Sequence, residues 1–277
     1  MSAPDFKRTS HAVWEAMAPG WDERHAYFEV SARPVAERMV ERLEPSSGQE
    51  ILELAAGTGV VGFTAAALVG PTGRVTISDF SEAMVEAAER HAAELGLANV
   101  EFRVLDAERI DLPDDAVDGV LCRWGYMLMS DPGQAFAETR RVLRPGGRLS
   151  CAVFGSAEQN PWVAIPTRVL QERGHMSGGS APGILALADL DRFRSFFAGA
   201  GFSEPRIDEV DFTWRFVDTN AYWDFLTGAA GAIAMVVGRL DGDEQESVRD
   251  EILRRVTTLT GDTDLELPAM SLVASAS

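Results

Sequence analysis

Residues 50–62 read EILELAAGTGVVG, and this stretch decides how the rest of the chain is interpreted. A short apolar run passes into a glycine-rich turn and then into the helical pattern of Phe63–Leu68. This order is typical of a buried parallel strand, a tight turn and a helix start that directs free N–H groups at a ligand. Gly57 and Gly59 let the backbone approach a ligand without a colliding Cβ. Glu53 is unusual, because it places an acid in the apolar run just before the glycines.

Composition limits the class of protein. The chain has 277 residues, of which 46% are apolar, so it is long enough for one large α/β domain with its own core. No segment has the roughly 18 unbroken apolar residues of a membrane span. Residues 1–10 lack the apolar segment of a signal peptide, and we therefore expect a cytoplasmic protein without a membrane span.

Charge and cysteine usage exclude further classes. The formal net charge is −18, so the surface repels phosphate backbones, and nucleic acid is not expected as a partner. Cys122 and Cys151 each lie in an apolar run, and neither has the spacing of a metal ligand. We expect both to be reduced core residues, and we expect no metal site.

Apolar, strand-like segments alternate with helical patterns along the chain. The expected strands are residues 51–54, 74–78, 100–105, 117–122, 148–154, 210–216 and 270–276, with a turn at 144–147. Residues 10–44, 221–239 and 243–259 carry helical patterns, and Ser81 and Asp189 are expected to cap two further helices. This alternation predicts a Rossmann-like, seven-stranded, mostly parallel sheet with helices on both faces.

The chain is expected to form a single domain over residues 1–277. Within it we expect an N-terminal helical cover (1–45), a cofactor-binding core (46–154) and a C-terminal part of the sheet (189–277). Residues 155–188 interrupt the alternation, are rich in Gly, Pro and Ser, and include a loop from Gly174 to Gly183. We interpret them as an inserted lid.

Three acids fall at the ends of three successive predicted strands: Glu53, Asp79 and Asp106. Ligands of such sheets bind at the carboxyl ends of the strands. Gly57–Gly62 matches Gly-x-Gly-x-x-Gly, with Asp79 following Gly57 by 22 residues, which taken alone also suits a dinucleotide. Glu53 argues against the dinucleotide, since it would repel a pyrophosphate, whereas it suits a cationic amino group.

The chain resembles a class I S-adenosylmethionine-dependent methyltransferase, of the group that includes the ubiquinone/menaquinone C-methyltransferases (UbiE). The resemblance rests on four motifs in order, which are ELAAGTG at residues 53–59, SDFS at 78–81, Asp106-Ala107 with Leu112-Pro113, and LRPGG at 143–147. It covers residues 50–154 densely. It implies an enzyme that uses S-adenosyl-L-methionine and releases S-adenosyl-L-homocysteine.

The resemblance also implies roles for particular residues. It implies that Glu53 lies under the methionyl ammonium and that the methionyl group contacts Ala55, Gly57 and Gly59. It implies that Asp79 accepts from the ribose hydroxyls, that adenine packs on Phe80 and Met84, and that Asp106 accepts from the adenine amino group with the Ala107 backbone beside it. It further implies that Arg123 offers its backbone near the methionyl group and that Trp21 covers the cofactor.

The acceptor is expected to be a small hydrophobic or aromatic molecule, enclosed by aromatic and apolar residues. Candidate walls are Trp14, Tyr27, Phe28, Trp124, Tyr126, Met127, Trp162 and Trp223. Candidate catalytic bases are His25 and His175, with Tyr27 and Asp131 as further candidates. Quinone carbon, phenolic oxygen, amine and sterol-like acceptors stay open, as does a homodimer. A cofactor-binding protein without catalysis and an NAD-dependent oxidoreductase are the alternatives.

Overall fold

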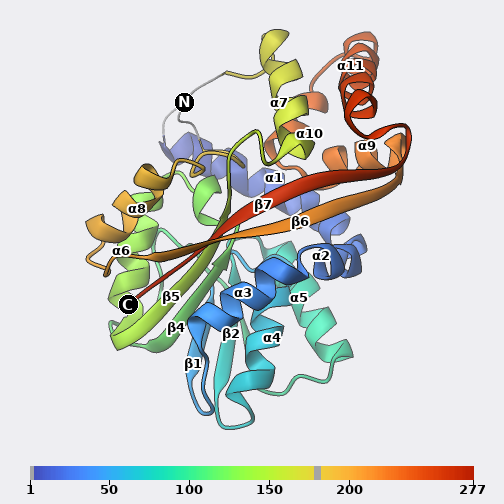
Figure 1. Cartoon of the computed structure of the whole chain (residues 1–277). Coiled ribbons are helices and arrows are strands. Elements are labelled where there is room, and N and C mark those ends of the chain that lie inside the picture. The colour runs from blue at the N-terminus through green and yellow to red at the C-terminus, as the bar shows by residue number, and fades with distance from the viewer. Residues whose placement is uncertain (1–2, 178–181) are drawn as a thin grey trace.

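The computed structural model of the chain describes residues 3–177 and 182–277. Seven strands form one sheet in the order β3-β2-β1-β4-β5-β7-β6 (Figure 1). Pairings among β1 to β5 are parallel, whereas β7 runs antiparallel to both of its neighbours, β5 and β6. The predicted seven-stranded, mostly parallel sheet is therefore confirmed.

The strands are β1 (Glu50–Glu53), β2 (Arg74–Asp79), β3 (Val100–Val104), β4 (Val117–Arg123), β5 (Leu143–Phe154), β6 (Arg206–Asp218) and β7 (Thr263–Ala276). The helices are α1 (Ala3–Glu23), α2 (His25–Ser31), α3 (Arg33–Leu43), α4 (Val60–Val69), α5 (Glu82–Glu94), α6 (Pro132–Val142), α7 (Pro161–Glu172), α8 (Leu190–Gly199), α9 (Thr219–Ala229), α10 (Ala232–Val237) and α11 (Gly242–Thr260), with a 3₁₀ turn at Tyr126–Leu128.

The strand order reverses between β1 and β4, and this reversal positions the site. From β1 the chain moves outward to β2 and β3, and it then returns to the other side of β1 to form β4 and β5. Because such crossovers are right-handed, α4 and α5 lie on one face of the sheet and α6 lies on the other. The carboxyl ends of β1 and β4 then border a crevice at the point of reversal, where ligands of such sheets bind.

Predicted local signals are confirmed at two helix starts. The Ser81 hydroxyl accepts a hydrogen bond from the Met84 backbone N–H, and the Asp189 carboxylate accepts one from the Arg192 backbone N–H. Each side chain satisfies one of the donors that a helix start leaves free. Cys122 and Cys151 face each other across β4 and β5, where both are buried and unbridged.

Three expected boundaries are wrong. Residues 144–147 do not form a turn before a strand, because β5 already begins at Leu143 and Gly146, with φ +81°, produces an irregularity within it. The helical pattern 221–239 divides into α9 and α10, since Gly231 adopts φ +41°.

The third difference lies in the last two strands, which are far longer than expected. β6 and β7 pair from Arg206 opposite Ser275 to Asp218 opposite Thr263 and extend toward α9 and α11 (Figure 1). The first half of β7 alternates exposed acids with buried Leu265 and Leu267. This alternation is too short and too charged to stand out in the sequence.

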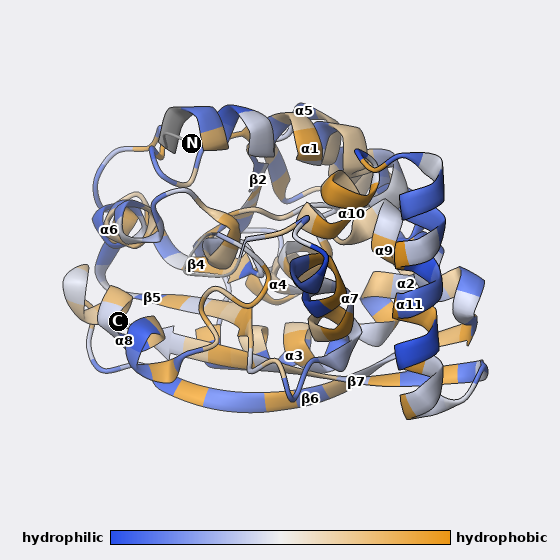
Figure 2. Cartoon of the chain, turned by 90° about the horizontal axis from the view of Figure 1, so that it is seen from above, coloured by the Kyte–Doolittle hydropathy of each residue, from blue (hydrophilic) through white to orange (hydrophobic). Residues whose placement is uncertain are grey.

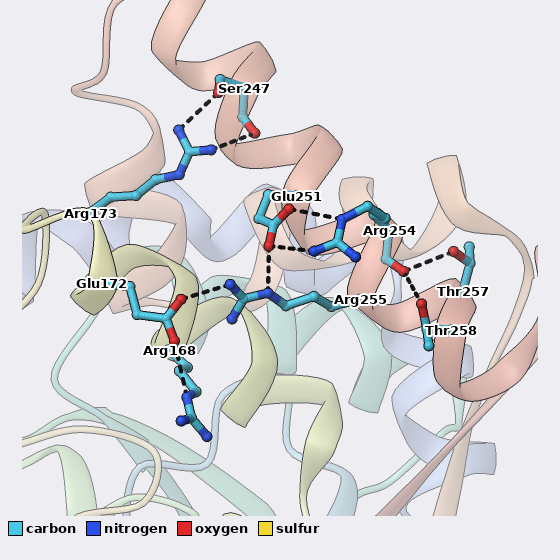
Figure 3. Close-up of polar contacts among 9 residues, drawn as sticks. All are labelled: Arg168, Glu172, Arg173, Ser247, Glu251, Arg254, Arg255, Thr257 and Thr258. Carbon is cyan, nitrogen blue, oxygen red and sulfur yellow. Dashed lines mark hydrogen bonds and ion pairs between the residues drawn. The ribbon is translucent and has the colours of Figure 1, made fainter.

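α7 lies inside the predicted lid and packs against α11. Figure 3 shows the polar contacts of this helix pair, in which Arg255 donates to Glu172 at 2.7 Å and Arg173 donates to the Ser247 hydroxyl at 2.9 Å. The predicted loop Gly174–Gly183 includes residues 178–181, which lie outside the described residues. Within 3–177 and 182–277, no helix has both the length and the apolar character needed to cross a membrane.

Candidate active site

The glycine loop is tied to the end of β2 by Asp79. Its Oδ2 accepts a hydrogen bond of 2.9 Å from the Gly57 backbone N–H, and its Oδ1 accepts one of 3.0 Å from the Ser81 backbone N–H. Burial raises the pKa of this carboxyl above its usual value, and the backbone N–H donors oppose the rise. Each oxygen retains acceptor capacity, so the carboxylate can still bind a ligand.

Glu53 lies beneath the glycine loop rather than on the pocket surface. Its side chain is buried, with 1% exposed, and Oε2 accepts a hydrogen bond of 2.9 Å from the Gly62 backbone N–H in the first turn of α4. Burial raises the pKa of Glu53 to about 8, although the Arg123 guanidinium lowers it. The odd acid of the sequence is therefore a buried group whose charge responds to what binds above it.

The ends of β1 and β4 carry unusual backbone conformations. Ala55 has φ +49° and Trp124 has φ +60°, both in the left-handed region that favours glycine. A Cβ on Gly125 would lie 2.6 Å from the Ala55 Cβ, so the two strand ends are in close contact. Two strained residues on adjacent strand ends are typical of a functional site, because the surrounding structure must hold them there.

One pocket joins the glycine loop to a cluster of aromatic rings, and its empty volume is about 1310 Å³ including the part open to solvent. Nine of the predicted cofactor residues line it, namely Trp21, Ala55, Gly57, Asp79, Phe80, Met84, Asp106, Ala107 and Arg123. The structure thus brings together residues that are far apart in the sequence. Glu53 and Gly59 are not among the lining residues, and Gly59 instead precedes α4 with φ +87°.

The wall opposite β2 and β3 comes from α1. Phe6, Lys7, Ser10, Trp14 and Trp21 of this helix line the pocket. Trp21 stacks on Phe28 with ring centroids 4.1 Å apart, and its Nε1 donates to the Ala229 carbonyl at 3.2 Å. Trp21 is thereby fixed beside the glycine loop.

Lys7 is a pocket residue that the sequence did not indicate. Its ammonium pairs with Asp106 and, at 3.2 Å, with Glu108. These partners raise the pKa of Lys7 although burial alone lowers it. Lys7 is the only lysine in the sequence, and this was the only sequence feature that could have drawn attention to it.

The far end of the pocket is aromatic. Of the predicted acceptor walls, Trp14, Phe28, Trp124, Met127 and Trp162 line it, while Tyr27, Tyr126 and Trp223 do not. Trp214 of β6 and Phe225 of α9 join them without having been predicted as pocket residues. Figure 2 shows α10, which begins next to this wall, as a mostly hydrophobic helix.

The indole N–H groups of the pocket differ in their partners. Trp124 donates to the Ser271 hydroxyl at 2.9 Å, and Trp162 donates to the Asn160 side-chain oxygen at 3.4 Å. The buried Nε1 of Trp214 has no hydrogen-bond partner among the described residues. A buried donor without a partner is costly to the fold.

The two catalytic histidine candidates do not line the pocket. His25 Nδ1 lies 2.8 Å from the Thr58 hydroxyl, its ring stacks on His91 at 3.7 Å, and burial lowers its pKa below its usual value. His175 lies 2.7 Å from Glu244 of α11. Asp131 caps α6 by accepting from the Gln134 backbone N–H, and Tyr27 donates to the Arg215 carbonyl. A catalytic role for these residues stays a prediction that the geometry does not support.

Known proteins match this arrangement. A methyltransferase-domain family model matches residues 45–180. The ubiquinone/menaquinone biosynthesis C-methyltransferase UbiE of Hahella chejuensis is 30% identical over 165 residues, which are 58% of this chain and 66% of that protein. UbiE of Pseudomonas entomophila is 38% identical over 109 residues, covering 39% and 43%.

Residues 45–180 therefore match a methyltransferase domain, and the chain is similar to the UbiE-like group of class I S-adenosylmethionine-dependent methyltransferases. In fold it is similar to a solved S-adenosylmethionine-dependent methyltransferase from Aquifex aeolicus, with a TM-score of 0.51 and 20% identity over 76% of this chain and 93% of that one. The match to the two curated relatives covers less than two thirds of their length.

The methyltransferase pocket combines residues from inside and outside the matched region. Residues 45–180 supply the glycine loop, Asp79, Asp106 and Arg123. Lys7 and Trp21 precede this region, and Trp214 and Phe225 follow it. The end of the pocket at the glycine loop is therefore built mainly by the matched region, and the aromatic end draws strongly on the rest of the chain.

Proposed function

We propose that this chain transfers a methyl group from S-adenosylmethionine to a small aromatic or otherwise apolar acceptor. The observation that carries the proposal is the continuity of the pocket, which joins Gly57 and Asp79 at one end to Trp124, Trp162 and Trp214 at the other. A donor and an apolar acceptor bound in one enclosed space can be aligned, and alignment alone supplies roughly 7–11 kcal/mol in favourable cases.

The cofactor end suits this donor. The Asp79 carboxylate holds the Gly57 backbone with one lone pair of Oδ2 and can accept ribose hydroxyls with the others. Gly57 presents no side chain, and a Cβ there would lie 3.8 Å from the Trp21 ring. Phe80 and Met84 offer apolar surface for adenine, with Asp106 beside them. When bound, S-adenosylmethionine supplies an electrophilic methyl group on a positively charged sulfur.

Charge in the pocket favours this donor over a dinucleotide. A pyrophosphate would place two negative charges beside the carboxylate of Asp79 and above Glu53, whose ionised form such charges disfavour. The methionyl ammonium and the sulfonium are positive and lower the cost of those buried carboxylates. Binding of S-adenosylhomocysteine without binding of NADH is the expected result, and the reverse would favour the oxidoreductase.

The acceptor end suits an apolar ring. Its walls are mainly indole and phenyl side chains, which bind flat apolar molecules and exclude water. The free Nε1 of Trp214 is a donor for an oxygen atom on such a molecule. α7 brings Trp162 to this wall and is held to α11 by the ion pair between Glu172 and Arg255, so we propose that the described residues of this region, 155–177 and 182–188, close the acceptor end.

A screen of phenols, quinones and amines with methyl-labelled S-adenosylmethionine tests the proposal. Label transfer to an aromatic acceptor is expected. Trp162→Leu is expected to raise the acceptor KM at unchanged affinity for S-adenosylhomocysteine, whereas Trp223→Leu, which alters a tryptophan outside the pocket lining, is the matched control. Binding of the cofactor without transfer to any acceptor class would favour a cofactor-binding protein without catalysis.

A further inference from the structure

Arg123 is a buried cation whose Nη1 has no hydrogen-bond partner among the described residues. Its side chain lies at the end of β4, is 9% exposed and lines the pocket. Nη1 is buried, and the opposite charge that acts on the guanidinium is the carboxylate of Glu53. Removing a charge from water without pairing it is strongly unfavourable.

The surroundings of Arg123 compensate its charge only in part. The guanidinium carbon lies 4.9 Å from the centre of the Trp124 ring, a cation–π contact that does not supply a hydrogen-bond acceptor to Nη1. Glu53 is the nearby opposite charge that raises the pKa of Arg123, but burial outweighs it and lowers that pKa to about 10. Glu53 also already accepts from the Gly62 backbone N–H, so the guanidinium remains available to a ligand.

A ligand that compensates the charge of Arg123 as well as bonding to it must be anionic, and it must tolerate Glu53 nearby. A zwitterion meets both conditions, because its two charges can face opposite partners. The cofactor of the proposed function carries such a group in its methionyl part, with an ammonium and a carboxylate on one carbon. Arginine binds a carboxylate through two parallel N–H donors, which a lone point charge cannot reproduce.

We infer that the guanidinium of Arg123 binds the carboxylate of the methionyl group, while Glu53 compensates the ammonium from beneath the glycine loop. The inference rests on the proposed function, and it assigns the Arg123 side chain a role beyond the backbone contact implied by family resemblance. The methionyl end of the pocket is then a site for an α-amino acid group, with one buried charge of each sign.

Titration of two ligands against three proteins tests the inference. The ligands are S-adenosylhomocysteine and its decarboxylated analogue, in which hydrogen replaces the carboxylate. The proteins are the wild type, Arg123→Met, which keeps the side-chain length without the charge, and Arg123→Lys, which keeps the charge without the planar fork. Dissociation constants and melting temperatures are measured for each protein.

The wild type is expected to prefer S-adenosylhomocysteine over the decarboxylated analogue by about tenfold or more, which corresponds to about 1.4 kcal/mol. Arg123→Met is expected to lose this preference by binding S-adenosylhomocysteine more weakly at unchanged affinity for the analogue. Arg123→Lys is expected to keep part of the preference for S-adenosylhomocysteine over the analogue. These changes depend on the carboxylate, so a merely structural role of Arg123 would not produce them.

Other outcomes overturn the inference. Equal weakening of both ligands by Arg123→Met would assign the side chain to the shape of the pocket. An unchanged preference, or a change confined to the acceptor KM, would place the partner of Arg123 elsewhere. In each of these cases S-adenosylhomocysteine still binds the wild type, so the proposed function stands. Absence of binding to the wild type would instead overturn the proposed function.

Discussion

The carboxylate of Asp79 accepts a 2.9 Å hydrogen bond from the backbone N–H of Gly57, and this bond joins the end of β2 to the glycine loop after β1. One side chain therefore shapes the loop and faces the pocket at the same time. The two strands are adjacent and parallel, so their carboxyl ends meet at the same edge of the sheet.

Asp79→Ala is expected to weaken S-adenosylhomocysteine binding by on the order of 1.5–3 kcal/mol, the usual effect of losing hydrogen bonds to a charged group. Asp189→Ala is the matched control, because it also removes a carboxylate that accepts a backbone N–H but lies outside the pocket lining. Calorimetric titration measures both. Equal dissociation constants for wild type and Asp79→Ala would move the ribose contact elsewhere.

Binding is expected to release a proton from Glu53. With a pKa of about 8, this carboxyl is mostly protonated in the free protein at neutral pH. A bound ammonium favours the ionised form and lowers the pKa, so up to about one proton leaves per site. Calorimetric titration in two buffers of different ionisation enthalpy measures the number of protons released on binding. This number should be smaller for the Glu53→Gln variant. The same proton release in both proteins would exclude Glu53 as the source.

Glu53 also makes the stability of the free protein depend on pH. Its folded pKa is raised above the usual value of 4.5, so its contribution to stability declines as pH rises from about 4.5 to about 8 and is constant beyond that. Glu53→Gln removes this decline while it keeps an acceptor for the Gly62 N–H. The difference in melting temperature between variant and wild type should therefore grow in favour of the variant over this range.

Gly62 is expected to tolerate no side chain. A Cβ there would lie well inside van der Waals distance of Ile77 Cδ1 and Glu53 Oε2, within a packed interior. Gly62→Ala should lower the free energy of unfolding by roughly 1–3 kcal/mol, as overpacking does. Gly199→Ala, in helix α8 with no atom within 4 Å of the new methyl group, is the control and should be neutral or slightly stabilising. Urea denaturation distinguishes the two.

A label on Lys7 can report ligand binding in the pocket. Reductive methylation with labelled formaldehyde marks this lysine and the α-amino group only, since the sequence has no other lysine. The Lys7 signal, assigned by its loss in Lys7→Arg, should shift when S-adenosylhomocysteine binds next to its partner Asp106. If the Lys7 signal does not shift at saturating S-adenosylhomocysteine, the adenine group binds away from α1.

His175→Ala is expected to leave kcat/KM within about twofold, because the imidazole lies against Glu244 of α11 and does not line the pocket. The same holds for His25→Gln, which removes a ring stacked on His91. Loss of activity by a factor of about 10²–10⁴ in either variant, at unchanged folding, would restore the general-base prediction.

Sequence patterns predicted the sheet and the grouping of the strand-end residues because both rest on local signals. Apolar runs, glycines and strand-end acids follow one another within residues 50–107, and parallel topology then brings Gly57, Asp79 and Asp106 together. The aromatic end has no such local signal. Trp214 and Phe225 reach the pocket only through the long pairing of β6 with β7 and the packing of α9.

Single residues also have environments that the sequence does not reveal. In the sequence, Arg123 is an ordinary charged residue near the end of a predicted strand. Only the three-dimensional packing shows that its Nη1 is buried without a hydrogen-bond partner among the described residues. Likewise, histidine was expected at the site from its chemistry, but His175 has a carboxylate partner on a helix 69 residues away in the sequence.

The measurement that tests the account most directly is a calorimetric titration of the wild-type protein with S-adenosylhomocysteine, with NADH as the comparison ligand. We predict one binding event with a dissociation constant of about 1 μM or tighter for S-adenosylhomocysteine, which corresponds to about 8 kcal/mol, and no binding of NADH. No detectable binding of S-adenosylhomocysteine at about 1 mM would contradict the assignment of S-adenosylmethionine as the methyl donor.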